Sequence, residues 1–178
     1  MATGYVMLWP GEVTFPDGAS GNAFPGIEQI LSSAAAPTNG CKVHFLQLVF
    51  DAATDEHVIF SFPLPGDYAS GGTLRVKWKR KSGTGAANAV WKAAVAALTA
   101  GGTEVPDSKA FSTVATTTTA AGTTANAVQE TTITLTMDSA AAGDMLYLML
   151  GRDGDNAADT LDAIDACVVG VTFEYTTA

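Results

Sequence analysis

The sequence is poor in the residues that most often carry chemistry or cross-links. It contains two cysteines and two histidines in 178 residues. Two cysteines do not make the disulfide framework of a small secreted domain, and Cys41 and Cys167 each begin an apolar run, so we expect both to be small buried residues. The histidines, His44 and His57, lack the close spacing with a carboxylate that a cupin-type metal site requires. A transition-metal centre is therefore not expected.

Basic residues are also scarce, with 9 Lys and Arg against 18 Asp and Glu, and the net charge is −9. Because phosphate binding needs a basic surface, we expect no nucleic-acid partner. Every apolar run falls short of the ~20 residues of a membrane-spanning helix, so no membrane partner is expected. The first residues, MATGYVMLWPGEV, have neither the basic start nor the long apolar stretch of a secretory signal, which predicts synthesis in a cytoplasm.

Catalytic motifs are missing as well. The Gly-x-Ser-x-Gly elbow of serine hydrolases is not present, and residues 18–21, GASG, have the wrong spacing. Neither cysteine has a histidine partner that the sequence can assign, and no pair of carboxylates stands out for glycoside hydrolysis. We therefore expect no enzymatic activity and no cofactor, with calcium at one acidic loop as the single alternative.

The clearest pattern that is present covers residues 50–81, where two alternating stretches flank a Pro- and Gly-rich corner at 63–68. Period-two alternation is typical of a strand with one dry and one wet face. The residues expected to point inward are Val58, Phe60, Phe62, Leu74, Val76 and Trp78. The basic row expected to point outward is Arg75, Lys77, Lys79 and Lys81.

Further apolar runs, separated by turn residues about every ten positions, bring the expected total to eight or nine strands. Residues 89–98 fit a helix or a strand, and we favour a strand because a Gly-rich turn ties them to residue 81. Residues 112–127 fit an edge strand or a surface loop. In the last strand, Val169, Val171, Phe173 and Tyr175 are expected to share one face. The other segments expected to form strands are 41–50, 128–137, 145–150 and 166–175, of which 41–50 and 145–150 are apolar on both faces and so expected to be central. The pattern predicts an all-β, two-sheet sandwich.

The N-terminal residues 1–40 differ from the rest, so we divide the chain into 1–40, an N-terminal strand and extended irregular arm, and 41–178, the sandwich domain. Phe15 and Phe24 are expected to tuck against a surface, either of the same subunit or of a neighbour. Residues 27–31 have the apolar spacing of one helical turn.

The loop at residues 152–165 is the best candidate for a ligand, because it contains five aspartates, one of them Asp162. Calcium prefers several hard oxygen ligands on a flexible loop, and Asp153, Asp155 and Asp159 offer them. The spacing is not that of an EF-hand. The alternative is a solvated acidic loop whose side chains cap turns.

The basic row has two interpretations. It is a surface for an acidic partner, or a guard against edge-to-edge aggregation. Together with the acidic loop it would also let copies of the chain dock. Trp78 and Trp91 lie among inward-facing apolar residues, so we expect them in the core rather than as platforms for sugar rings.

The order of strand and turn segments resembles a group of single jelly-roll proteins of tailed-phage virions. The segments that carry the likeness are FDAATDEHVIFSFPLPGDY (50–68), GGTLRVKWK (71–79), VWKAAV (90–95), AGDMLYLMLGRDG (142–154) and DACVVGVTFEY (165–175). The resemblance implies a jelly-roll fold and a non-enzymatic capsid decoration (cement) protein, made in the host cytoplasm and located on the virion. It implies a homo-oligomer, most often a trimer, that binds other virion proteins such as the major capsid protein. The partner-binding residues would be Arg75, Lys77, Lys79, Lys81, Phe15 and Phe24. The alternative is a glycan- or receptor-binding jelly-roll module of a tail fibre.

Overall fold

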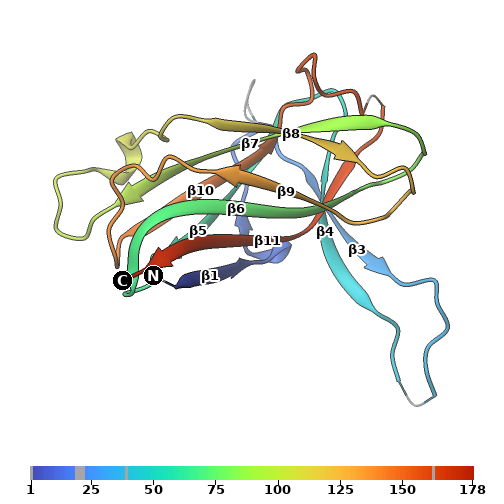
Figure 1. The fold of residues 1–178 in the computed structure, drawn as a ribbon, viewed down its shortest axis with the longest axis horizontal. Helices are drawn as coiled ribbons and strands as arrows, with labels where there is room; N and C mark the ends of the chain where they lie inside the picture. Colours follow the sequence, from blue (N-terminus) through green and yellow to red (C-terminus); the bar gives the residue numbers. More distant parts are fainter. Residues whose placement is uncertain (1, 19–22, 39, 162) are drawn as a thin grey trace.

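The computed structural model describes residues 2–18, 23–38, 40–161 and 163–178. They form two antiparallel sheets packed face to face (Figure 1). The strands are β1 (Thr3–Leu8), β2 (Val13–Thr14), β3 (Gly26–Leu31), β4 (His44–Phe50), β5 (Glu56–Pro63), β6 (Tyr68–Arg80), β7 (Ala87–Leu98), β8 (Ala115–Ala121), β9 (Gln129–Thr134), β10 (Met145–Arg152) and β11 (Ala166–Thr177). Two short 3₁₀ turns, η1 (Pro10–Glu12) and η2 (Pro106–Ser108), lie in the connections.

From β4 onward the chain passes back and forth between the two sheets in jelly-roll order, except that β7 and β8 form a hairpin within one sheet. One sheet runs β3-β4-β11-β6-β9, with β1 also paired to β11, and the other runs β2-β5-β10-β7-β8. Without β1, β2 and β3 these are two four-stranded layers, which is the arrangement of a jelly roll. The predicted all-β jelly-roll sandwich is confirmed. The strand count exceeds the predicted eight or nine because the N-terminal segment contributes three short strands.

Alternation on β5, β6 and β7 places the core as predicted. Phe50 meets Trp91 edge-on with ring centroids 5.3 Å apart, and Trp91 meets Trp78 at 5.5 Å. The Trp78 indole N–H donates to Thr131 Oγ1 at 2.8 Å, which satisfies its buried polar atom. Both tryptophans are fully buried, so neither can serve as a platform for a ligand. Strand β7 confirms the strand interpretation of residues 89–98.

The corner at 63–68 carries the chain from one sheet to the other, as expected. Pro63 ends β5 in the five-stranded sheet, and Tyr68 begins β6 in the six-stranded sheet. The Tyr68 N–H donates to the Pro65 carbonyl at 3.0 Å, and Leu64 is buried beneath the turn. Proline is suited to this position because it cannot continue a sheet ladder.

The face predicted for β11 is wrong at Val169. The pairing with β6 jumps from Val168↔Trp78 to Gly170↔Lys77, so Val169 is the extra residue of a β-bulge. One inserted residue reverses the alternation, and the inward position before the bulge therefore belongs to Val168. Val169 is only half-buried, whereas Val171 and the residues after it point into the core as expected.

The N-terminal segment packs along its own chain. β1 pairs with β11, β2 with β5, and β3 with β4. The Phe15 and Phe24 rings lie 5.1 Å apart; Phe15 packs against the core, and Phe24 remains exposed. The helical turn expected at 27–31 is wrong, because Ile27 pairs with Leu48 and Ile30 with Phe45 in a β ladder.

The β3–β4 hairpin extends beyond the sandwich (Figure 1). Only the second half of β4, from Gln47, is buried, and β4 is second from the sheet edge rather than central. Cys41 lies in the connection before β4 and is exposed, which corrects its expected burial, because no second sheet covers the hairpin there. Cys167 is buried as expected, and burial raises the pKa of its thiol to about 11. No helix among the described residues is long and apolar enough to cross a membrane.

Candidate functional site

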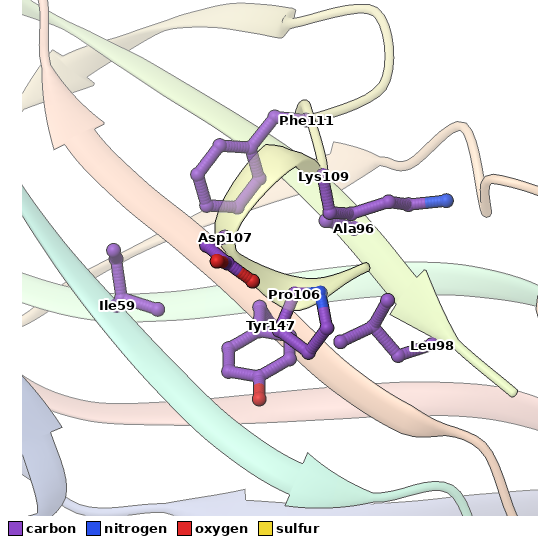
Figure 2. Close-up of a pocket in the computed structure, with 8 residues that line it drawn as sticks. All are labelled: Ile59, Ala96, Leu98, Pro106, Asp107, Lys109, Phe111 and Tyr147. Atoms are coloured by element: carbon purple, nitrogen blue, oxygen red, sulfur yellow. The ribbon is translucent and has the colours of Figure 1, made fainter. Parts of the chain in front are cut away.

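A pocket of about 470 Å³ lies on the outer face of the five-stranded sheet. This volume falls within the range of about 300–1,000 Å³ found for small-ligand sites. The sheet supplies the floor, and the connection between β7 and β8 supplies a wall (Figure 2). The lining residues are Ile59, Ala96, Leu98, Pro106, Asp107, Lys109, Phe111 and Tyr147.

The floor of the pocket has one large aromatic ring, that of Tyr147, with short side chains on either side of it. Tyr147 on β10 is paired with Ala96 on β7 and with Ser61 on β5. Because directly paired residues share a face of the sheet, the Tyr147 ring stands between two short side chains. It is half-buried, and its aromatic surface forms part of the pocket.

The wall is held in place by hydrogen bonds of Ser112 and by a paired lysine. The Ser112 N–H donates to the Val95 carbonyl at 2.7 Å, and Ser112 Oγ donates to the Thr136 carbonyl at 2.9 Å. The Lys109 ammonium bonds to Asp138 at 2.9 Å and to Glu104, and these bonds raise the pKa of Lys109. Lys109 therefore anchors the wall and is not free for a ligand.

Phe111 and Asp107 present the other ligand-facing groups. Figure 2 shows the Asp107 carboxylate between the rings of Phe111 and Tyr147. Both Asp107 and Phe111 are exposed, and within the described part of the chain Asp107 has no hydrogen-bond partner. The pocket thus combines two aromatic ring surfaces with one free carboxylate, a hydrogen-bond acceptor, which is suited to a ligand with apolar faces and hydroxyl edges.

The opposite end of the same sheet face carries a charged cluster. The Lys92 ammonium bonds to Asp153 Oδ1 at 3.2 Å and to Asp55, and oxygens of Asp55, Asp153 and Asp155 lie within 4.8 Å of one another. Burial would raise the pKa of Asp153, but hydrogen bonds from Asn156 and Lys92 outweigh it and lower that pKa. Lys92 therefore stands where a bound cation would otherwise neutralise these carboxylates.

His57 covers the sheet beside this cluster. Its ring lies over Gly151, where an added Cβ would be 2.7 Å from His57 Cδ2. Burial, and then the charge of Lys92, lower the pKa of His57 below its usual 6.5. The imidazole is therefore neutral at pH 7.

The predicted calcium residues do not all come together. Asp153 and Asp155 share the cluster with Asp55, whereas Asp159 forms a buried forked ion pair with Arg152, with Nη2–Oδ1 at 2.8 Å and Nε–Oδ2 at 2.9 Å. Asp159 Oδ2 also accepts from the Val90 N–H at 3.0 Å. Asp159 is thus committed to structure. Asp162 lies outside the described residues.

The basic row lies on the face of β6 away from the core, as the alternation predicted, but Lys79 is buried there and most of the row is neutralised within the chain. Arg75 bonds to Glu130 at 2.8 Å and to Glu174 at 2.6 Å, and Lys81 bonds to Glu28 at 2.9 Å. The remaining pairs are Lys81 with Asp165 at 3.4 Å, Lys79 with Asn126 at 2.9 Å, and Lys79 over the Phe45 ring at 5.7 Å. Lys77 alone in the row is exposed without an ion pair to any described residue. Little free positive charge remains there for a partner.

The residues of the pocket were not among the sequence-based candidates. Tyr147 lies inside the run MLYLML, which is apolar on both faces and hence was expected to be wholly buried. The connection that carries Asp107 and Phe111 has no periodic pattern. The one available signal was the run of alanines on β7, because alternate small residues beside a bulky strand leave space on a sheet face.

No protein-family model matches the sequence, and no curated protein matches it. Among solved structures, the CBM22-2 xylan-binding domain from Paenibacillus barcinonensis Xyn10C is similar with a TM-score of 0.50 and 14% identity, over 94% of this chain and 93% of that one. The CBM22-1 xylan-binding domain of the same Xyn10C gives 0.46 and 11%, over 98% and 87%. The family 11 carbohydrate-binding module from Clostridium thermocellum, in complex with a mixed-linked tetrasaccharide, gives 0.43 and 7%, over 96% and 87%. Of these three only the first reaches 0.5, and at 14% identity it bears on the fold alone.

Proposed function

We propose that this chain is a non-catalytic carbohydrate-binding jelly-roll module that holds a glycan against the outer face of its five-stranded sheet. The observation that carries the proposal is the pocket in which Tyr147 and Phe111 flank Asp107 above a floor containing Ala96. A sugar ring has apolar faces that stack on aromatic rings and hydroxyl edges that donate to a carboxylate. The jelly-roll fold shared with a xylan-binding domain supports the same proposal.

The charges around the pocket favour binding over hydrolysis. Glycoside hydrolysis uses two carboxyl groups that flank the scissile bond, about 5–5.5 Å apart in retaining and 6.5–9.5 Å apart in inverting enzymes. Asp107 is the one carboxylate among the described residues that line the pocket. The neighbouring Glu104 and Asp138 are engaged by Lys109. A pair free to act on a bound glycan is not available in this part of the chain.

A glycan array followed by calorimetric titration of the best oligosaccharide tests the proposal. Micromolar or tighter binding that Phe111→Ala weakens by roughly tenfold, equivalent to ~1.4 kcal/mol, would support it. Tyr5→Ala is the matched control, because Tyr5 is an exposed aromatic on the six-stranded sheet. Binding that is equally strong in both variants would place the glycan elsewhere, and an array without hits would overturn the proposal.

A second proposal is a structural virion role, as a decoration or tail-fibre protein that assembles with copies of itself, most often as a trimer. The projecting β3–β4 hairpin supports it, because Ile27, Leu31, Val43 and Leu46 expose apolar side chains there. Exposed apolar surface of this kind favours protein contacts. Light scattering tests self-assembly: an oligomer that Leu31→Ser dissociates is expected, and a monomer at high concentration would contradict it. Detection of the chain in purified particles would test the virion location.

A further inference from the structure

The face that carries the pocket is acidic at both ends. At one end, Lys92 bonds to Asp55 and Asp153, and Asp155 lies beside them. At the other end Lys109 bonds to two carboxylates, those of Glu104 and Asp138, and the pocket adds Asp107. Each end thus has one ammonium bonded to two carboxylates, and a third, exposed carboxylate that has no hydrogen-bond partner among the described residues.

Among the residues that the structure describes, the sheet between the two ends carries no positive charge to offset these carboxylates. The paired positions along it include Ile59 with Met149, and Met149 with Ala94, all uncharged. His57 is neutral at pH 7 because burial and Lys92 lower its pKa. Lys92, at the first end, pairs with Gly151, and Ala96, in the pocket, pairs with Tyr147. Gly151 and Tyr147 are four residues apart on β10, which separates the two pairs by roughly 13 Å at ~3.3 Å per residue. A glycan long enough to span this separation would approach both acidic ends.

We infer that this face selects glycans by charge: it favours amino sugars with a free ammonium group, accepts neutral sugars and rejects uronic acids. The inference rests on the proposed glycan-binding function and names the sugar class for the same site. An ammonium group in the pocket meets the Asp107 carboxylate and the faces of the Phe111 and Tyr147 rings. Carboxylates and aromatic faces both attract cations, and both disfavour a second carboxylate.

Three matched β-1,4-linked oligosaccharides test the inference, made of glucose, of glucosamine and of glucuronic acid. Titrations are run at a pH that keeps the amines protonated, in low and in high salt. We expect the glucosamine oligomer to bind more tightly than the glucose oligomer by roughly two- to fivefold for each exposed charge pair. The glucuronic acid oligomer should bind more weakly than the glucose oligomer. High salt should reduce both differences, because it screens exposed charges.

Asp107→Asn separates this selectivity from binding itself. The variant keeps an oxygen that accepts from a sugar hydroxyl but loses the charge, so it should lose two- to fivefold more affinity for the glucosamine oligomer than for the glucose oligomer. Glu12→Gln is the matched control, because Glu12 is an exposed carboxylate in η1, outside the pocket. Glu12→Gln lowers the net negative charge by the same amount as Asp107→Asn and should leave the preference for the glucosamine oligomer unchanged.

The two proposals fail in different ways. If the glucose oligomer binds and Phe111→Ala weakens it, but the charged oligomers bind equally well, the charge selectivity is wrong and the glycan site stands. If Asp107→Asn and Glu12→Gln reduce the preference equally, the effect comes from overall charge, and the inference is overturned. If none of the three oligomers binds, both proposals are overturned.

Discussion

Tyr147 on β10 lies directly opposite Ala96 on β7, and the methyl side chain of Ala96 leaves the phenol ring uncovered on that side. This pairing makes one aromatic residue of an otherwise buried strand available to a ligand. Two changes therefore test the pocket in opposite ways. One removes the ring, and the other covers it.

Tyr147→Ala should weaken glycan binding by roughly tenfold, or ~1.4 kcal/mol, because a stacking surface is lost. Ala96→Leu should weaken binding as well, because a larger side chain would fill the floor beside the ring. Calorimetric titration with one oligosaccharide measures both. Thermal unfolding of each variant checks that the fold persists. If Tyr147→Ala stays folded and keeps the wild-type affinity, the ring does not contact the glycan.

Asp159→Asn should reduce the free energy of unfolding by about 3–5 kcal/mol, because it leaves the buried Arg152 guanidinium without its counter-charge. Arg152 also donates to the carbonyls of Asp51, Leu161 and Ile164, so it ties two loops, the β4–β5 and β10–β11 connections, to β10. Urea denaturation measures the change. Asp155→Asn removes an exposed aspartate from the same loop and should leave the unfolding midpoint unchanged. Equal midpoints for the two variants would show that the buried pair does not stabilise the fold.

Gly151→Ala should destabilise the protein by about 1–3 kcal/mol, because an added methyl group in a packed site forces its neighbours apart. The new Cβ would lie 2.7 Å from His57 Cδ2 and 2.8 Å from the Glu56 carbonyl oxygen, and the latter is backbone and cannot rotate away. Gly26→Ala is the matched control, because nothing lies within 4 Å of a Cβ there. Chemical denaturation measures the free energy of unfolding of both variants. A loss of stability no larger for Gly151→Ala than for Gly26→Ala would contradict the packing described.

His57 should make stability depend on pH near neutrality. Its folded pKa is lowered from 6.5 by burial and by Lys92, so the unfolded chain binds more protons in this range. The stability that the neutral His57 ring contributes is therefore complete above pH ~6.5 and is lost as the pH falls towards the folded pKa. Over that range the free energy of unfolding declines by at most ~1.4 kcal/mol per pH unit. Unfolding free energies measured from about pH 7.5 to 5.5 should decline in the wild type and decline less in His57→Gln. Identical slopes would rule out this linkage.

The local sequence pattern was sufficient to predict the strand faces and the corner at 63–68, because residue types close together in the chain decide both. Alternation predicted that Val76 and Trp78 point inward and Lys77 outward, because a strand at the surface of a sandwich can bury only one face. The corner at 63–68 followed from prolines that cannot extend a ladder. The same reasoning predicted the wrong face for Val169, because the β-bulge there depends on how β11 pairs with β6.

The sequence by itself thus determined an all-β sandwich, its core faces and the scarcity of catalytic residues. Only the tertiary structure decided which charges meet. Glu130 and Glu174 neutralise Arg75 from 55 and 99 residues away, and Asp55 rather than Asp159 joins Asp153. Whether Tyr147 is buried or open depends on what covers the outer face of its sheet. These outcomes rest on contacts between strands distant in the chain, and distances across a sheet are set by pairing register, which local propensity does not contain.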